Sequence, residues 1–340
     1  MLLTAEANLC AGGLCDSSGV TMRRLSFIPA LVSAILLGAC SGGSIAPSIV
    51  SAPGTGVDQP QGTTAVGAAF LTPAPSAAAL AYKIYVTNSG PASETGSVTT
   101  YGISGKKTKP TITKGLDYPV GVAVDRHGKI YVTSYVTNTL TTYNPDGTGT
   151  TPTITTGLDQ PVGVKVDAAG KIYVANLAGG ARGSGYLSTY KPDGTRTTPT
   201  IVSGTDEAWG VAIDTKGKIY VTNYGGANVT TYTSKGQRTT PTITTGKNSF
   251  PLGVTVDAKG KIYVNESGKN TLMTYMADGK RTTPTITGLN NPQGVVVDAD
   301  GKIFVVNYGS NTVTTYTSKG KRTTPTITSG LSGPVGITLH

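Results

Sequence analysis

From about residue 80 onward, the chain is a succession of short segments in which apolar residues alternate with threonine or other polar residues. One stretch reads Pro-Val-Gly-Val-Ala-Val-Asp from Pro119, then Lys-Ile-Tyr-Val from Lys129, then a threonine-rich segment that ends at Tyr143. It closes with Thr-Pro-Thr-Ile-Thr from Thr151. A period of two is typical of half-buried antiparallel strands, and Asn-Pro-Asp-Gly at 144–147 is typical of a tight turn. The pattern therefore predicts a unit of four short strands.

Six copies of this unit follow one another at intervals of roughly 41 to 47 residues, a period typical of propeller blades. The Lys-Ile-Tyr/Phe-Val element begins at Lys83, Lys129, Lys171, Lys218, Lys261 and Lys302. The Pro-x-Gly element begins at Pro119, Pro161, Pro251, Pro292 and Pro334, and Ala-Trp-Gly at 208–210 replaces it once. The fourth segment of each unit carries a proline, which favours the outer edge of a sheet.

The two ends of the repeat region indicate how the units are arranged. The region opens at Lys83 on a second strand and finishes at 334–339 on a first strand. One blade is therefore expected to be split between the chain ends, and pairing of these ends would close a ring. The sequence predicts an all-β fold, a six-bladed β-propeller of four-stranded antiparallel blades whose C-terminal strand completes the first blade.

The units resemble NHL repeats, and residues 119–132, Pro-Val-Gly-Val-Ala-Val-Asp-Arg-His-Gly-Lys-Ile-Tyr-Val, carry the resemblance with their counterparts. It covers about residues 81–340 and is specific for the fold. It is much less specific for activity, because related propellers include lactonases of the gluconolactonase type and streptogramin lyases. Some NHL domains bind RNA.

The N-terminal part of the chain reads as an export signal. From Met22, two arginines precede an apolar run that ends at Ala39 and is shorter than the ~20 residues that span a bilayer. We expect a signal peptide at 22–39 and an over-extended start at 1–21. The end of the run, Leu-Gly-Ala-Cys, resembles the lipobox of bacterial lipoproteins, which implies that Cys40 is lipidated and becomes the mature N-terminus.

Residues 40–80 are rich in Ser, Ala, Gly, Pro and Thr, a composition that suits a flexible tether. Ser41 follows the cysteine at the place where, by the rule of the lipoprotein family, an aspartate would retain the protein at the inner membrane. The resemblance therefore favours an anchor in a bacterial outer membrane, facing the periplasm or the cell surface.

The composition of the chain limits which folds and which metal or thiol sites are possible. The chain has 46 Gly and 20 Pro, which argue against a helical bundle, and only three Cys and two His. In the related lactonases, metal ligands come from the residue before the glycine of the innermost strand. The matching residues here are Val120, Val162, Trp209, Leu252, Gln293 and Val335. Five of these six lack the oxygen ligands that a divalent cation needs, so we predict no metal and no other cofactor.

Two other sets of residues could suggest catalysis. The aspartates that follow each first strand are expected to cap their own turns rather than to form a carboxylate cluster. His127 and His340 have no plausible partner in the sequence, which argues against a catalytic histidine. No catalytic residue is predicted, and whether the protein is an enzyme stays open. The aspartates in question are Asp125, Asp167, Asp214, Asp257 and Asp298.

Charge separates two faces of the predicted ring. The chain has 28 Lys and Arg against 18 Asp and Glu. We call the side with turns one-to-two and three-to-four of each blade the basic face, because most of these cations fall there. Its densest clusters contain Lys280, Arg281, Lys319, Lys321 and Arg322. These residues either are solvated turn residues or attract an anionic polymer or anionic lipid. A lack of interleaved aromatics argues against nucleic acid.

The opposite side, with turns two-to-three and four-to-one, is the neutral face, where propellers of this resemblance usually bind ligands. Its candidate ligand-binding residues are Trp209 and Gln293 at the mouth, Tyr135, Tyr224 and Tyr308 after second strands, and Asn176 and Asn223 at strand ends. Aromatic faces beside amides suit a peptide or a glycan. Turn capping by the asparagines and channel packing by Trp209 are the alternatives.

These observations predict a lipid-anchored, non-enzymatic scaffold of the cell envelope that binds a protein, peptide or glycan through its neutral face. Two alternatives stay open. One is a lactonase- or lyase-like propeller enzyme that uses an unfamiliar site. The other is a structural protein that binds anionic envelope polymers through its basic face.

Overall fold

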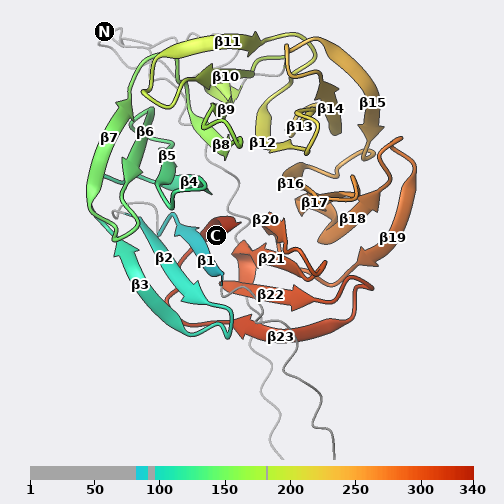
Figure 1. Cartoon of the computed structure of the whole chain (residues 1–340). Coiled ribbons are helices and arrows are strands. Elements are labelled where there is room, and N and C mark those ends of the chain that lie inside the picture. The colour runs from blue at the N-terminus through green and yellow to red at the C-terminus, as the bar shows by residue number, and fades with distance from the viewer. Residues whose placement is uncertain (1–81, 91–95, 181–182) are drawn as a thin grey trace, which may run out of the picture. The chain divides into compact units, whose positions relative to one another are not determined.

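The computed structural model of the chain describes residues 82–90, 96–180 and 183–340. The described residues form six four-stranded antiparallel sheets arranged as the blades of a ring (Figure 1). The predicted six-bladed β-propeller is therefore confirmed. The expected leader segments at 1–21 and 22–39, the lipidation site Cys40 and the tether lie outside the described residues.

We number the blades I to VI and give the strands of each from the innermost outward. Blade I contains β24 (Pro334–Leu339), β1 (Lys83–Asn88), β2 (Ser97–Gly102) and β3 (Lys107–Ile112). Blade II contains β4 (Pro119–Val124), β5 (Ile130–Ser134), β6 (Thr139–Tyr143) and β7 (Gly149–Ile154). Blade III contains β8 (Pro161–Val166), β9 (Ile172–Asn176), β10 (Tyr186–Tyr190) and β11 (Arg196–Ile201).

Blade IV contains β12 (Ala208–Ile213), β13 (Ile219–Asn223), β14 (Asn228–Tyr232) and β15 (Arg238–Thr244). Blade V contains β16 (Pro251–Val256), β17 (Ile262–Glu266), β18 (Thr271–Tyr275) and β19 (Arg281–Ile286). Blade VI contains β20 (Pro292–Val297), β21 (Ile303–Asn307), β22 (Thr312–Tyr316) and β23 (Arg322–Ile327).

Three short 3₁₀ turns follow second strands: η1 (Ala178–Gly180), η2 (Ser267–Lys269) and η3 (Tyr308–Ser310). Within the described ranges, no helix is long and apolar enough to cross a membrane.

The ring closes where the two ends of the repeat region meet. Strand β24 pairs antiparallel with β1, with Ile337 opposite Val86 and Leu339 opposite Ile84. One further pair of backbone hydrogen bonds joins Lys83 and His340, at 2.6 and 3.0 Å between nitrogen and oxygen. The last strand of the chain is thus the innermost strand of the first blade, as the sequence predicts.

The inner-strand glycine allows neighbouring inner strands to approach closely. A Cβ on Gly121 would clash with the carbonyl oxygen of Val162 in the next blade. Thr133 fastens this junction, because its hydroxyl accepts a 2.8 Å bond from the Gly121 N–H and donates a 2.6 Å bond to the Val162 carbonyl. The Pro-x-Gly motif therefore encodes contact between blades as well as a strand.

Between the blades, apolar side chains from both sheets form a continuous core. At the junction of blades II and III, Ala123, Tyr131 and Leu140 pack with Val164 and Ile172. All five are nearly or fully inaccessible to solvent. This explains why the same aliphatic and tyrosine positions recur in every unit.

The repeated aspartates stabilise the turns that follow the inner strands. Asp125 Oδ1 accepts bonds from the backbone N–H groups of His127 and Lys129 at 2.9 and 3.0 Å. Its Oδ2 accepts a 3.1 Å bond from the hydroxyl of Tyr131. The arrangement recurs at Asp167, Asp214 and Asp257. The predicted capping role of these carboxylates is confirmed.

In blade VI the tyrosine of this arrangement is replaced, but the hydrogen bond to the aspartate is kept. Its second strand has Phe304, which has no hydroxyl to offer Asp298. Tyr82, from the strand entrance of blade I, packs edge-on against Phe304 with ring centroids 6.1 Å apart. Its hydroxyl donates a 2.8 Å bond to Asp298 Oδ2. A residue of the neighbouring blade, at a position that is glycine in the other units, thus supplies the missing donor.

Candidate binding face

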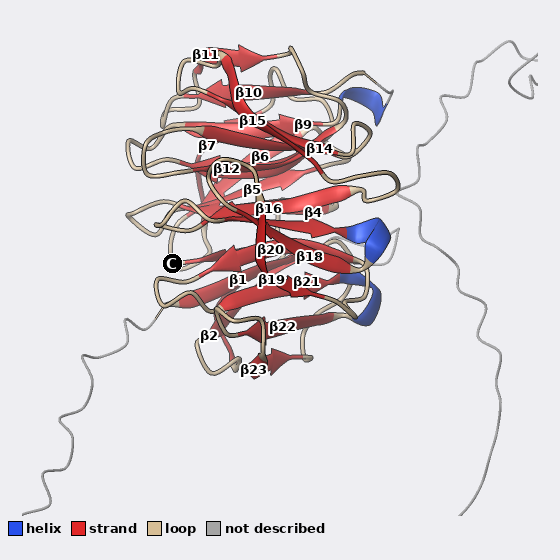
Figure 2. Ribbon diagram, turned by 90° about the vertical axis from the view of Figure 1, so that its right-hand side faces the viewer, coloured by secondary structure: helices blue, strands red, loops and turns tan. Residues whose placement is uncertain are grey.

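The two faces of the ring differ in how their loops are built. Figure 2 shows the 3₁₀ turns gathered along one side of the propeller, while the C-terminus lies on the other. The 3₁₀ turns follow second strands and so belong to the neutral face.

A ring of six residues in the left-handed conformation surrounds the mouth on the neutral face. Each lies directly before an inner strand, and their φ angles fall between 46° and 55°. The six are Tyr118, Gln160, Glu207, Phe250, Asn291 and Gly333. Five have a side chain, for which this conformation is strained, and such strain persists only where the surroundings enforce it.

Two sets of hydrogen bonds enforce it. The carbonyl of each left-handed residue accepts a bond from the N–H of the residue that follows the second strand, as at 3.1 Å from Tyr135 to Tyr118 and from Tyr224 to Glu207. In addition, Asn138 Oδ1 of the preceding blade accepts a 2.6 Å bond from the N–H of Gln160. Asn270 and Asn311 hold Asn291 and Gly333 in the same way. The rim therefore has a fixed backbone that carries variable side chains.

One aromatic cluster lies on blades IV and V. The rings of Trp209 and Tyr224 have centroids 6.1 Å apart, and Phe250 stacks on Tyr224 at 5.0 Å with an interplanar angle of 22°. Phe250 is 37% exposed, whereas Trp209 is only 8% exposed. The Trp209 indole is therefore packed at the base of the cluster. The rings of Tyr224 and Phe250 lie on the solvent side of the cluster.

A second aromatic cluster contains residues of blades II and VI, which come together beside blade I. Tyr118 and Tyr135 have ring centroids 5.9 Å apart. Blade I has only Gly333 and Ser89 at the equivalent rim positions, which leaves room for Tyr118 to interact with Tyr308. Burial, followed by the interaction with Tyr308, raises the pKa of Tyr118 to about 12.

The four predicted aromatic candidates thus separate into two groups. Trp209 and Tyr224 lie in one cluster, and Tyr135 and Tyr308 belong to the other. Blades I and IV are opposite in a six-membered ring, so the clusters lie on opposite sides of the mouth. Tyr118 and Phe250 complete the clusters and were not among the predicted residues. Their signal in the sequence is an aromatic residue directly before the proline of an inner strand.

The central channel below the mouth is narrow and largely apolar. A cavity of about 80 Å³ is lined by the residues before, at and after the inner-strand glycines, including Val120, Trp209 and Gln293. Gln293 is nearly buried, and its Nε2 donates a 3.0 Å bond to Asn291 Oδ1. This amide pair is the polar element of blade VI at the mouth.

Asn176 and Asn223 are fully buried and act within their own blades. The Oδ1 atoms accept 3.1 Å bonds from the N–H groups of Asp159 and Asp206. Their amide nitrogens bond to Ser188 and Thr230, respectively, each at 3.0 Å. This is the turn-capping alternative, and it leaves neither amide exposed to a ligand.

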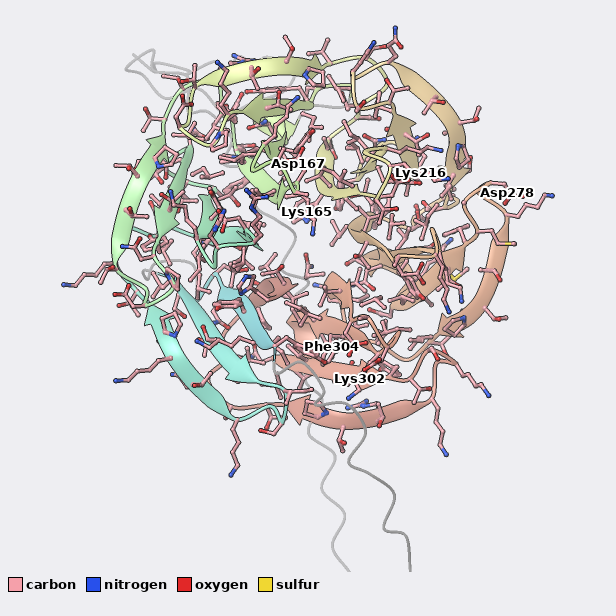
Figure 3. The ribbon with its side chains drawn as sticks, in the orientation of Figure 1. Lys165, Asp167, Lys216, Asp278, Lys302 and Phe304 are labelled. Atoms are coloured by element: carbon pink, nitrogen blue, oxygen red, sulfur yellow. The ribbon has the colours of Figure 1, made fainter. Side chains whose placement is uncertain are left out.

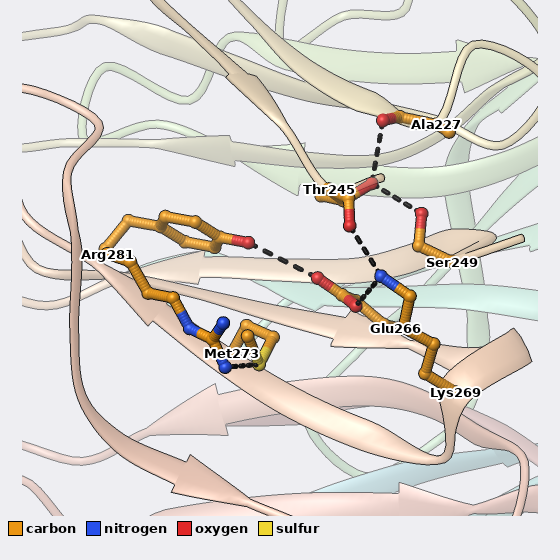
Figure 4. Close-up of polar contacts among 8 residues, drawn as sticks. Ala227, Thr245, Ser249, Glu266, Lys269, Met273 and Arg281 are labelled. Atoms are coloured by element: carbon orange, nitrogen blue, oxygen red, sulfur yellow. Dashed lines mark hydrogen bonds and ion pairs between the residues drawn. The ribbon is translucent and has the colours of Figure 1, made fainter. Parts of the chain in front are cut away.

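Blade V has Glu266 where four other blades have this asparagine, and the change brings a charge network with it (Figure 4). Glu266 is 1% exposed, and its Oε2 lies 3.2 Å from Lys269 Nζ. The Tyr275 hydroxyl lies 3.3 Å from Oε1, and Lys269 also donates a 2.7 Å bond to the Thr245 carbonyl. Burial, followed by the nearby carboxylate, raises the pKa of Tyr275. The ion pair with Lys269 compensates the charge of this buried carboxylate, so the network has a structural role.

The predicted basic residues lie at the outer turns between third and fourth strands. Lys280 Nζ is 3.3 Å from Asp278 Oδ2, and both side chains are exposed (Figure 3 labels Asp278). Arg281 contacts the sulfur of Met273 at 3.3 Å, and Arg322 lies 5.6 Å from the ring centroid of Tyr316. Lys319 and Lys321 lie in the exposed turn between β22 and β23.

The lysines of the inner turns are more constrained than the sequence suggests. Lys129 and Lys261 reach the carbonyls of Thr151 and Thr283 in the outer strand of their own blade, each at 2.7 Å. Lys171 and Lys218 bond to Thr198 and Thr240 in the same way. Part of the positive charge of the basic face therefore braces the blades.

Comparison with known proteins identifies the fold. No family model and no curated protein matches the chain. Among solved structures, a nidogen/laminin complex chain is 18% identical, with a TM-score of 0.63, over 76% of this chain and 98% of its own. A streptogramin B lyase is 16% identical, with a TM-score of 0.53, over 75% and 76%. Virginiamycin B lyase from Staphylococcus aureus is 15% identical, with a TM-score of 0.55, over 75% and 92%. At these identities the likeness shows the β-propeller fold alone.

Among the described residues, no three His, Cys, Asp or Glu side chains come together in a way that could hold a metal ion. The polar groups that gather at the mouth are amides, tyrosine hydroxyls and the carboxylate of Glu207. Such an arrangement can stack on a flat or apolar ligand surface and hydrogen-bond to its edges.

Proposed function

We propose that this protein is a lipid-anchored binding protein of the bacterial cell envelope, and that it recognises a peptide, protein or glycan through its neutral face. The observation that carries the proposal is the pair of aromatic clusters on opposite sides of the mouth, built on a rim of left-handed residues. Side chains that break the repeat are placed there on a backbone that does not vary.

The chemistry of the rim favours a ligand with both flat apolar surfaces and hydrogen-bonding edges. Tyr224 and Phe250 offer stacked rings, and Gln293 with Asn291 offers an amide pair near the channel. Pyranose rings and peptide side chains meet this description. The nidogen/laminin neighbour supports protein binding as a use of this fold.

The test is a screen of the full chain against arrays of envelope glycans and peptides, followed by titration of the best ligand. Phe250→Ala and Trp209→Ala should each weaken binding, and the loss should reach about 2 kcal/mol if the ring is a central anchor. Met276→Ala, an exposed apolar residue on the basic face, is the matched control. Treatment with EDTA should leave binding unchanged. Binding that is insensitive to both rim variants but abolished by EDTA would overturn the proposal.

The lipid anchor is tested separately. Cys40→Ala should release the protein from the membrane fraction and abolish incorporation of labelled palmitate. Cys15→Ala, within the expected over-extended start, should change neither. Membrane retention of Cys40→Ala with unchanged mobility would refute lipidation and leave a simple apolar anchor.

A second candidate function is a lyase or lactonase activity, favoured by the lyases among the structural neighbours. Assays with a streptogramin B and with simple lactones, with and without added divalent cations, test it. Turnover that is lost in Trp209→Ala but kept in Met276→Ala would establish the enzyme function in place of the scaffold.

A further inference from the structure

The inner strands of the propeller contain a single charged residue, Lys165. It occupies the second position after the inner-strand glycine of blade III. The equivalent residues of the other five blades are Ala123, Ala212, Thr255, Val296 and Thr338. A lysine at this position has no counterpart in the repeat, so the fold does not require it.

Its side chain cannot pack as its counterparts do. Ala123 and Ala212 are nearly buried between blades, whereas the side chain of Lys165 is exposed. Figure 3 shows Lys165 extending into the central opening of the ring. Lys165 is two residues before Asp167, which begins a turn on the basic face, so the amine lies at that end of the channel. Solvent therefore reaches an amine that the ring surrounds.

The amine has no partner among the described residues. Asp167 is the nearest carboxylate in sequence, but its two oxygens are occupied by the N–H groups of Ala169 and Lys171 and by the hydroxyl of Tyr173. Enclosure by the protein lowers the pKa of Lys165, because the charged form loses part of its hydration. The ring surrounds this amine without burying it, and the described residues place no anion beside it, so only solvent balances its charge.

We propose that the basic-face end of the central channel binds a small oxyanion, a carboxylate or a phosphate, through the amine of Lys165. An oxyanion would supply the missing charge and accept a charge-assisted hydrogen bond. Thr255 and Thr338 occupy the same repeat position as Lys165 in blades V and I, and they are the residues with a hydroxyl group at this position. The cationic turns of this face raise the local concentration of anions. The site is at the opposite end of the channel from the aromatic rim and does not depend on the function proposed there.

Inorganic phosphate and acetate are the probes, titrated into the full chain by calorimetry in a chloride-free buffer. Lys165→Met should weaken binding about tenfold or more, the effect of losing one charge-assisted hydrogen bond. Lys216→Met removes an exposed cation from the inner turn of the next blade, outside the opening, and should weaken binding far less than Lys165→Met. Lys165→Arg should retain most of the affinity because it keeps a cation in the opening. Equal binding by Lys165→Met and the unaltered chain would overturn the proposal.

A measurement on the unaltered protein keeps the proposal testable if Lys165→Met does not fold. Acetic anhydride at pH 8 should acetylate Lys165 faster than Lys216, and phosphate should protect Lys165 selectively, as read by peptide mass spectrometry. The same experiment with dextran sulfate distinguishes a small oxyanion from an anionic polymer. Protection of Lys165 by dextran sulfate but not by phosphate would contradict a small-anion site, as would no protection by either.

Discussion

The turns of the basic face and those of the neutral face are stabilised in different ways. On the basic face, both backbone and side chain repeat, so that Asp125 and its counterparts make the same bonds in successive blades. On the neutral face, only the backbone repeats: each left-handed residue accepts the same bond, but its side chain ranges from glycine to tyrosine. Sequence variation is therefore concentrated where the backbone is held by other means, and such positions can acquire binding roles without loss of the fold.

The largest effect should come from breaking the ring at the repeated inner strands. Deletion of 334–340 removes β24, the partner of β1, and exposes the cores on both sides of it. We expect a loss of several kcal/mol from a total free energy of unfolding of about 5–15 kcal/mol. Urea denaturation measures it. His340→Ala, which keeps the backbone bonds to Lys83, is the control, and an undiminished midpoint in the deletion would refute closure by β24.

A smaller loss is expected at a single inner-strand glycine. Gly121→Ala places a methyl group against the Val162 carbonyl, so neighbouring inner strands must move apart. Overpacking of this kind costs about 1–3 kcal/mol. Gly149→Ala is the matched control, since a Cβ there meets no atom within 4 Å. Equal thermal midpoints for the two variants would show that the inner strands can separate without cost.

The neutral face should respond to alkaline pH. The pKa of Tyr118 is raised to about 12 in the folded protein, whereas an unfolded tyrosine ionises near pH 10. The stability linked to Tyr118 is complete below pH 10 and is lost as the pH rises from 10 towards 12. Tyr118→Phe should therefore lose less stability over that window than the unaltered chain, in urea titrations at pH 9 and 11.5. Parallel losses in both proteins would place the Tyr118 hydroxyl in solvent.

The smallest effect is expected at Gln160 on the rim, where the backbone is strained and the side-chain oxygen makes no hydrogen bond. Gln160 is left-handed, and its Oε1 is buried without a hydrogen-bond partner. Gln160→Gly relieves about 1–2 kcal/mol of left-handed strain, against an entropy cost of about 0.5–1 kcal/mol for glycine. A change within about 1 kcal/mol, neutral or stabilising, is expected by denaturant titration. Marked destabilisation would show that the Gln160 side chain contributes to the fold.

The sequence alone was sufficient for the architecture, because each blade repeats the same strand pattern and the two chain ends carry complementary parts of one blade. It was also sufficient for the turn aspartates of blades II to V, whose bonds are made to residues at most six positions away. Local patterns of this kind are readable because the atoms that interact are close along the chain.

Contacts between blades were decided only by the tertiary structure. Tyr118 and Tyr308 meet because blade I has Gly333 and Ser89 between them. Lys165 reads as one more lysine in a basic chain until the ring places it in the central opening. The period of a repeat specifies which strands form, whereas the surroundings of a side chain depend on the neighbouring blade, whose residues are about forty positions away along the chain.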